Sequence, residues 1–301
     1  RTCCGRARMP SDGGPERDGQ LDQLVSAVHA SARYRTVAEP LVRSLGAREL
    51  AKRRGLKEAI KATKNKLHQV AGAYVDEPRY DAWLAFLRSE WESASEEAAA
   101  QEAQEAHRRA ALRSVMGRHA STRERLPILD QFYAQTLASL GPIRSVVDVA
   151  CGLNPLALRW LPLADDADYY AYDIYDDMMA LVNGYFALEA AHGRAMLRAR
   201  AEMRDVIASP PERRAELALI LKAIPCLEQV DKTAGERLLR AIRADHLLIS
   251  FPAHSLGGKH KGMVESYEAR FHDLLAKTGV GVGAEVQRFE FATELAFLVS
   301  R

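Results

Sequence analysis

The stretch VVDVACGLNP, residues 146–155, leads from an apolar run through one aspartate into a turn of small residues and a proline. Valines flank Asp148 on both sides, and β-branched residues favour strands. Ala150 and Gly152 leave room for a ligand to approach the backbone closely. Ligands of a parallel sheet bind beyond the carboxyl ends of its strands, so we interpret this stretch as a buried strand that ends at a ligand site.

Runs rich in β-forming residues continue from here to residue 300 and alternate with helical runs. They read SVVDVA (145–150), ADYYAYDI (167–174), AMLRARAEM (195–203), ELALILKAI (216–224), DHLLISF (245–251), VQRFEFA (286–292) and ELAFLVS (294–300). Strands that alternate with helices indicate a parallel sheet with helices on both faces. The last two runs lie only a residue or two apart. We therefore predict a Rossmann-like α/β sheet that is mostly parallel and closed by an antiparallel C-terminal hairpin.

The chain before residue 118 follows a different pattern. From Leu21 to about Met116, apolar residues recur at spacings of three and four, which predicts helices throughout. Residues 1–20 are rich in Gly, Pro and charge, which is typical of a disordered tail. We therefore predict three parts: a tail at 1–20, an all-α domain at 21–118 and the sheet domain at 119–301.

The formal net charge of +2 conceals two blocks of opposite sign. Between Arg33 and Lys66 there are eleven Lys or Arg residues against three Glu residues, whereas from Asp76 to Glu105 acidic residues predominate. A block this basic indicates a polyphosphate partner such as RNA. Its candidate RNA-binding residues are Arg33, Arg35, Lys52, Arg53, Arg54, Lys57, Lys61, Lys64 and Lys66.

Cysteine spacing and hydropathy argue against other kinds of site. The four cysteines form no CxxC pair and no Cys/His spacing suited to zinc, so we expect no metal. The sequence has no window of about 18 apolar residues, and its start lacks a signal-peptide pattern. We expect a cytoplasmic protein with no membrane partner.

Carboxylates end the first three strands of the predicted sheet, at Asp148, Asp173 and near Asp205. Only Gly152 represents the three glycines of a dinucleotide fingerprint, so a ligand without a pyrophosphate fits better. Asp173 is suitably placed to accept the hydroxyls of a ribose, and Asp205 with Val206 to accept an adenine amino group beside an apolar wall. This pattern indicates S-adenosylmethionine, although each aspartate by itself also suits a helix N-cap.

The fourth strand runs into Lys222-Ala-Ile-Pro225, which lacks the Asn/Asp-Pro-Pro-Tyr motif that accepts the hydrogens of an exocyclic amine. Pro225-Cys226 superficially supplies the nucleophile for C5-pyrimidine methylation. The helical spacing around Cys226 favours a buried small hydrophobe instead. Guanine N7 is a different target because its lone pair is already free, so positioning suffices and no general base is required. A lysine or arginine could contact guanine O6.

The fifth strand ends at Ser250-Phe251-Pro252 and is followed by the loop AHSLGGKHKGM. Phe251 could stack on a flipped base, and the loop residues Lys259 and Lys261 could hold its flanking phosphates. The alternatives are a core position for Phe251 and a solvated loop for the two lysines.

These residues resemble the aminoglycoside-resistance 16S ribosomal RNA (guanine-N7) methyltransferases. The resemblance is carried by HASTRERLPILDQFY (119–133), DVACGLNPLAL (148–158), LILKAIPCLE (219–228) and SFPAHSLGGKHKGM (250–263), and it extends over most of the chain from Arg33 onward. The combination of STRER with ACGLNP is far more specific than either motif alone. The resemblance implies methylation of guanine 1405 at N7 with S-adenosylmethionine, within the A site of helix 44 in the assembled 30S subunit.

The resemblance also assigns site residues in this chain. It implies that Lys222 and Phe251 hold the guanine, that the helical domain docks on the ribosome, and that Ser250, Lys259 and Lys261 contact RNA. The family places a glutamine a few residues after the segment CLE, and Gln229 matches that position to within one residue. The implied cofactor contacts are Tyr74, His119, Ala120, Ser121, Thr122, Arg123, Glu124, Arg125, Ala150, Gly152, Asp173, Asp205, Val206, Leu221 and Gln229.

Two other functions fit part of this pattern. One is methylation of the neighbouring A-site adenine at N1, and the other is a protein without turnover that protects the A site by occupancy. The intact cofactor motifs argue against the second function. We expect a monomer, because the basic face must lie flat on RNA and the sequence shows no long unpaired apolar stripe.

Overall fold

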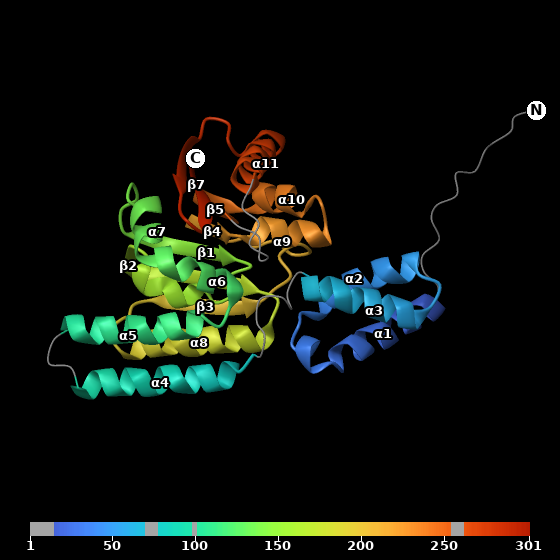
Figure 1. Cartoon of the computed structure of the whole chain (residues 1–301), viewed down its shortest axis with the longest axis horizontal. Helices are drawn as coiled ribbons and strands as arrows, with labels where there is room; N and C mark the ends of the chain where they lie inside the picture. Colours follow the sequence, from blue (N-terminus) through green and yellow to red (C-terminus); the bar gives the residue numbers. More distant parts are fainter. Residues whose placement is uncertain (1–14, 70–77, 98–100, 254–261) are drawn as a thin grey trace, which may run out of the picture.

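The computed structural model describes residues 15–69, 78–97, 101–253 and 262–301 (Figure 1). The elements before the sheet are α1 (Pro15–His29), η1 (Ala32–Tyr34), α2 (Glu39–Lys52), α3 (Leu56–Leu67), α4 (Tyr80–Glu97), α5 (Gln101–Met116), α6 (Ala120–Arg125), η3 (Leu126–Ile128) and α7 (Leu129–Thr136). The remaining elements are β1 (Ile143–Val149), η4 (Asn154–Trp160), β2 (Leu163–Asp173), α8 (Asp176–Ala191), β3 (Arg198–Met203), β4 (Arg214–Leu221), α9 (Ala223–Val230), α10 (Ala234–Ala241), β5 (Arg243–Pro252), α11 (Met263–Thr278), β6 (Glu285–Glu290) and β7 (Glu294–Ser300).

The seven strands form one sheet in the order β3-β2-β1-β4-β5-β7-β6. Strands β1 to β5 run parallel, and β7 pairs antiparallel with both β5 and β6. The predicted parallel sheet with an antiparallel C-terminal hairpin is therefore confirmed. The chain proceeds outward from β1 to β3 and then returns to β4 on the other side of β1. This reversal is the switch point at which open α/β sheets bind their ligands.

Apolar side chains fill both faces of the sheet. Helices α4, α5 and α8 lie on one face and α9, α10 and α11 on the other (Figure 1). The approach of α4 to α8 is close at Gly184, where a Cβ atom would lie 2.4 Å from Cδ2 of Leu84. A glycine in the interior of a helix lowers helix propensity, and here it permits this close packing. Among the described helices, none is both long and apolar enough to span a bilayer.

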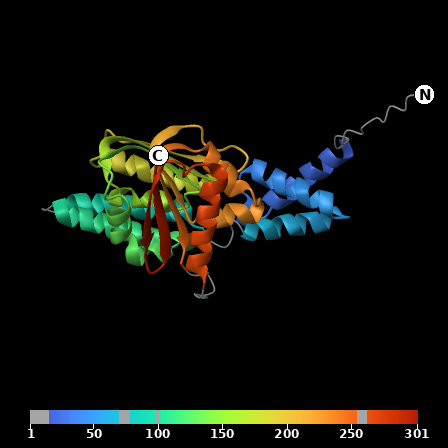
Figure 2. The same ribbon diagram turned by 90° about the horizontal axis from the view of Figure 1, so that it is seen from above.

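Helices α1, α2 and α3 share a separate core and lie at one end of the molecule (Figure 2). We call residues 15–69 the N-terminal unit. By contrast, Trp91 of α4 and Leu112 of α5 belong to the core of the sheet domain. The expected all-α domain at 21–118 is thus divided, because α4 packs on α8, and α5 packs on α4 and η4. Helix α1 already begins at Pro15, inside the expected tail.

Candidate functional site

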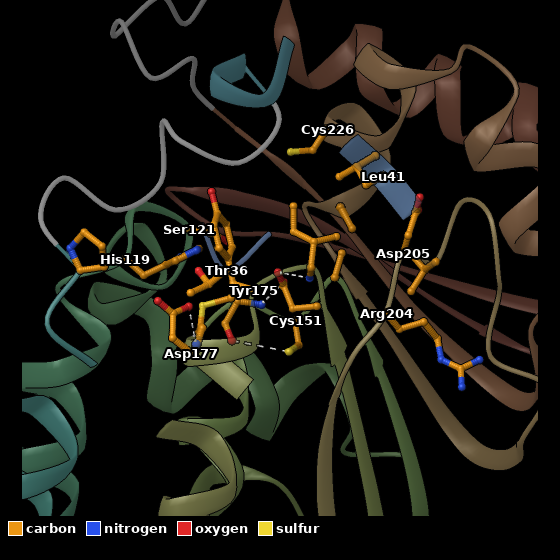
Figure 3. Close-up of a pocket in the computed structure, with 18 of the residues that line it drawn as sticks. Thr36, Leu41, His119, Ser121, Cys151, Tyr175, Asp177, Arg204, Asp205 and Cys226 are labelled. Carbon is orange, nitrogen blue, oxygen red and sulfur yellow. Dashed lines mark hydrogen bonds between the residues drawn. The ribbon is translucent and has the colours of Figure 1, made fainter. Parts of the chain in front are cut away.

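A cavity of about 540 Å³ opens at the carboxyl ends of the first four strands (Figure 3). Cavities of this size suit small organic ligands and cofactors. Its lining contains many of the residues that the sequence singles out: His119, Ser121, Ala150, Gly152, Asp173, Asp205, Val206, Leu221 and Lys222. The switch point of the sheet and these predicted residues therefore coincide in space.

Asp148 does not line this cavity, contrary to its expected place in the cofactor pocket. Its Oδ2 atom accepts hydrogen bonds from Nδ2 of Asn154 at 2.8 Å and from the hydroxyl of Tyr169 at 2.7 Å. Burial raises the pKa of Asp148 to about 6, although these two bonds act to lower it. Asp148 therefore stabilises the turn after β1 through these two bonds. The residues that follow it, Ala150 and Gly152, line the cavity.

The turn after β1 has a left-handed backbone at two positions. Ala150 has φ 51° and Gly152 has φ 53°. A non-glycine residue in this region carries backbone strain, and such strain often marks a functional site. A Cβ atom on Gly152 would lie 2.8 Å from Cε1 of His119. The absence of a side chain at Gly152 therefore lets the imidazole ring pack directly on the turn.

His119 precedes α6 and is buried beside three cations. Burial, together with the charges of Lys222, Arg123 and Arg125, lowers the pKa of His119 to about 3. The ring is consequently neutral at physiological pH. It forms an uncharged part of the cavity wall next to Gly152.

The two strand-end aspartates in the cavity also organise their own turns. Asp173 accepts the backbone N–H groups of Gly152 at 2.8 Å and Ile174 at 2.7 Å, and burial raises its pKa. The Oδ1 atom of Asp205 accepts the N–H of Ile207 at 2.9 Å. A carboxylate has about four acceptor sites, so both side chains retain capacity for a ligand. The turn-capping and ligand-binding interpretations are therefore compatible.

Lys222 follows β4 with φ 56°, a second strained position beside the cavity. Its backbone N–H donates to the carbonyl of Ser250 at 3.0 Å. Its Nζ atom donates to the carbonyl of Ser121 at 3.1 Å and to Glu124 at 2.9 Å, and lies 3.5 Å from Glu294. These contacts fix one cation at the edge of the cavity and connect it to α6.

Arg125 is directed away from the cavity, so its expected contact with the cofactor is not supported by the structure. Its guanidinium makes two bonds to Glu294, at 2.6 and 3.0 Å, and a third to Asn154 at 2.8 Å. Ser250 was expected to contact RNA, but it is fully buried and donates to Glu294 at 2.5 Å. The side chains of Arg125 and Ser250 are therefore both engaged with the buried carboxylate of Glu294.

Phe251 also differs from its prediction, because its ring is fully buried and stacks on Tyr267 with a centroid distance of 5.2 Å. Its core alternative is correct, and the ring has no exposed face for a base. Gln229 is exposed on α9 and does not line the cavity, whereas Cys226 and Leu227 of the same helix do. Cys226 is half-buried in that wall, so its description as a buried small hydrophobe is only partly correct.

The other residues of the HASTRER segment have mixed positions. Ala120 and Thr122 are buried and Arg123 is exposed; none of the three lines the cavity. The Thr122 hydroxyl donates to the carbonyls of Met116 and His119, at 2.5 and 3.1 Å. Glu124 does not line the cavity but accepts a hydrogen bond from Lys222, which does. Tyr74, Lys259 and Lys261 lie outside the described residues.

The basic block forms a largely exposed surface on the N-terminal unit. Lys57 and Lys61 of α3 are exposed, and Lys64 and Lys66 are half-buried. The other exposed members are Arg33, Arg35, Lys52, Arg53 and Arg54. Within this group, Lys52 and Arg53 pair with Glu49, at 3.8 and 3.0 Å. Arg33 also lines the cavity, a position that the charge pattern did not predict.

Several cavity residues were missed by sequence reasoning. Thr36 and Leu41 come from the N-terminal unit, and Tyr80 from the start of α4. Asp177 and Arg204 lie shortly after β2 and β3, so their positions at strand ends were a signal that could have identified them. Thr36 and Leu41 carried no such signal, because neither follows a strand or belongs to a motif.

The lining fits S-adenosylmethionine. Gly152 and Ala150 give backbone access, Asp173 and Asp205 offer hydrogen-bond acceptors, and Val206, Leu221 and Leu227 supply an apolar wall. Carboxylates in the lining suit hydroxyl and amino groups. The described residues contain no cluster of His, Cys, Asp or Glu suited to a metal ion.

Comparisons with known proteins agree with this geometry. A family model described as ribosomal RNA methyltransferase (FmrO) matches residues 30–298. The 16S rRNA (guanine(1405)-N(7))-methyltransferase of Micromonospora rosea is 33% identical over 287 residues, covering 94% of this chain and 98% of that protein. The enzyme of the same name from Frankia casuarinae is 35% identical over 286 residues, covering 93% and 94%.

Solved structures show the same fold. The 16S rRNA methyltransferase RmtF in complex with S-adenosyl-L-homocysteine superposes with a TM-score of 0.75 at 29% identity, covering 96% of this chain and 100% of that chain. The 16S rRNA methylase RmtB gives a TM-score of 0.72 at 26% identity, covering 93% and 98%. The similarity therefore includes the N-terminal unit as well as the sheet.

Proposed function

The chain belongs to the ribosomal RNA methyltransferase (FmrO) family, and we propose that it methylates N7 of guanine 1405 in 16S rRNA with S-adenosylmethionine. The observation that supports this most directly is the cavity at the switch point. Strained backbone at Ala150 and Lys222 surrounds it, and Asp173 and Asp205 face it. Strain that persists beside a cavity favours a functional role over a purely structural one.

S-adenosylmethionine, when bound, supplies an electrophilic methyl group on a sulfonium. Asp173 and Asp205 would hold its hydroxyl and amino groups, and Val206 and Leu221 would contact its adenine. The neutral ring of His119 beside Gly152 limits the access of water to this side of the cavity. The chain's part in the reaction is therefore to bind, orient and desolvate.

Lys222 is the residue that we assign to the guanine. Its side chain is 7% exposed, and its ammonium group is held by α6 at the edge of the cavity. A fixed cation can donate to guanine O6 and so orient the ring. Because the N7 lone pair lies free in the plane of the base, the reaction needs no proton acceptor, and orientation supplies most of the rate enhancement. The burial of Phe251 leaves Lys222 as the described residue that carries this assignment.

The partner that we propose is the A site of helix 44 in the assembled 30S subunit, bound by a monomer. The exposed lysines of α3 and the arginines between α2 and α3 would contact phosphates without reading sequence. Methylation at N7 of this guanine would give resistance to aminoglycosides of the 4,6-disubstituted 2-deoxystreptamine type. A cytoplasmic location follows from this partner and stays a prediction.

Transfer of labelled methyl from S-adenosylmethionine tests this function, with purified 30S subunits and free 16S rRNA as alternative acceptors. We expect label in the 30S subunits and little in free rRNA. Lys222→Ala should reduce transfer at least about 100-fold, since loss of one oriented charged donor costs about that much. Lys232→Ala, at an exposed lysine after α9, is the matched control. Equal transfer by the two variants would refute the role of Lys222, and no label in either acceptor would refute the function.

A further inference from the structure

The N-terminal unit contacts the sheet domain directly beside the cavity. Val37 forms an antiparallel bridge with Tyr175. The N–H of Ala38 donates to the carbonyl of Ile174 at 2.8 Å, and the N–H of Asp176 donates to the carbonyl of Thr36 at 3.0 Å. These bonds hold the turn that immediately follows Asp173. The segment 36–38 therefore fixes the position of one wall of the cavity.

A second contact reaches the part of the cavity wall that α9 forms. Arg48 of α2 donates to the carbonyl of Val230 at 3.0 Å and lies 3.5 Å from Asp231. Val230 is the last residue of α9, and it packs against the core of the N-terminal unit. Cys226, Leu227 and Val230 of this helix line the cavity. The unit thus contacts both the turn after β2 and the end of α9.

The N-terminal unit also places its own side chains in the cavity. Thr36 and Leu41 both belong to the lining, together with Tyr175 of the turn after β2 and Cys226 of α9 (Figure 3). Burial raises the pKa of Asp177, a lining residue as well, and a hydrogen bond with the Thr36 side chain acts to lower that pKa. Backbone and side chain of Thr36 therefore hold the same turn.

We propose that the N-terminal unit completes the cofactor site, with Thr36 as the positioning residue that holds the turn at 174–177 for S-adenosylmethionine. This inference rests on the proposed function, because that function identifies the occupant. It gives the unit a second role beside RNA docking. Cofactor affinity then depends on a part of the chain that lies outside the methyltransferase sheet.

The expected effect is confined to binding. Thr36→Val keeps the shape of the side chain and removes the hydroxyl. We expect the dissociation constant for S-adenosylhomocysteine to rise about threefold to tenfold, the ratio that corresponds to the net contribution of one hydrogen bond. The KM for S-adenosylmethionine should rise by a similar factor. The kcat at saturating cofactor should stay near that of the wild type, because Thr36 does not contact the reacting atoms.

Titration calorimetry of the full chain with S-adenosylhomocysteine is the test, with two further variants. Thr36→Ser retains the hydroxyl and should restore most of the affinity. Thr63→Val is the matched control: it removes a buried hydroxyl bond of 2.8 Å to Ala59 inside the same unit, away from the cavity. It should lower thermal stability at least as much as Thr36→Val and leave affinity unchanged.

The possible outcomes separate the two proposals. Binding by the wild type with weakening only in Thr36→Val supports the inference. Equal affinity of the wild type and Thr36→Val overturns it and leaves the proposed function intact. Equal weakening in Thr36→Val and Thr63→Val also overturns it, since the effect would then be one of general stability. If the wild type itself does not bind S-adenosylhomocysteine, the proposed function fails, and the inference fails with it.

Discussion

Glu294 offers the sharpest test of the internal ion pair behind the cavity. It is fully buried at the start of β7 and accepts two hydrogen bonds from Arg125 and one from Ser250. Burial acts to raise the pKa of Glu294, but the charges of Arg125 and Lys222 outweigh it and lower the pKa below its usual range. The side chain is therefore ionised at neutral pH.

Glu294→Gln keeps the size of the side chain and removes its charge. Arg125, whose side chain is 1% exposed, then loses the carboxylate to which its guanidinium makes two hydrogen bonds. Removing one partner of a buried pair costs about 3–5 kcal/mol, because the other charge is left uncompensated. We expect a loss of this size in the free energy of unfolding. The loss should be present above about pH 4.3, where the unfolded carboxylate is ionised, and should shrink as pH falls.

Urea unfolding of the two proteins at about pH 7.5 measures this difference. Glu290→Gln is the matched control, since Glu290 pairs with Arg288 at 2.7 Å on the surface of β6. Exposed pairs contribute little, so its effect should stay within about 0.5 kcal/mol. A loss below about 1 kcal/mol in Glu294→Gln would refute the argument that this pair stabilises the junction of α6, β5 and β7.

Three further predictions concern His119, Gly152 and the lysine pair Lys57 and Lys61. Because folding lowers the pKa of His119 from 6.5 to about 3, stability should fall as pH drops below 6.5. Between about pH 7.5 and 5.5, the wild type should lose about 1.4 kcal/mol more than His119→Gln in urea unfolding, and parallel pH profiles would contradict this. Gly152→Ala adds a Cβ atom at φ 53° and 2.8 Å from His119, so it should cost about 1–2 kcal/mol and weaken S-adenosylhomocysteine binding in calorimetry. Unchanged affinity would show that the turn does not contact the cofactor. Lys57→Ala with Lys61→Ala should lower the slope of log affinity for 30S subunits against log salt by about 0.7–0.9 per lost phosphate contact, without changing S-adenosylhomocysteine affinity. An unchanged slope would show that Lys57 and Lys61 do not contact the phosphates of the 30S subunit.

The sheet could be predicted because each strand carries its own local signal. Alternating runs fixed the number of strands, and the carboxylates at their ends located the cavity. The orientation of single side chains was harder to predict. Asp148 ends β1 as expected, yet its carboxylate points to Asn154 and Tyr169. A strand-end position places a residue at the correct edge but does not decide which side of the turn its side chain faces.

Long-range contacts account for the other errors. Arg125, Ser250 and Lys222 meet around Glu294, which belongs to no recognised motif and lies 169 residues after Arg125. No local pattern reveals that such a partner exists. The division of the helical region has the same origin, because amphipathic spacing shows that α4 has an apolar face without showing which surface covers it. Gln229 shows the same difficulty, because it lies three residues after Cys226, a helical spacing that places two side chains on the same side. Even so, Gln229 is exposed and outside the cavity lining.

The central claim is methylation of one ring nitrogen in one nucleotide, and strand scission tests it most directly. 30S subunits treated with the enzyme and S-adenosylmethionine are exposed to borohydride and aniline, which cleave rRNA at 7-methylguanine. We predict a new cleavage at guanine 1405 that requires both enzyme and cofactor. Methyl incorporation without cleavage there would contradict the account and move the target to another atom or base.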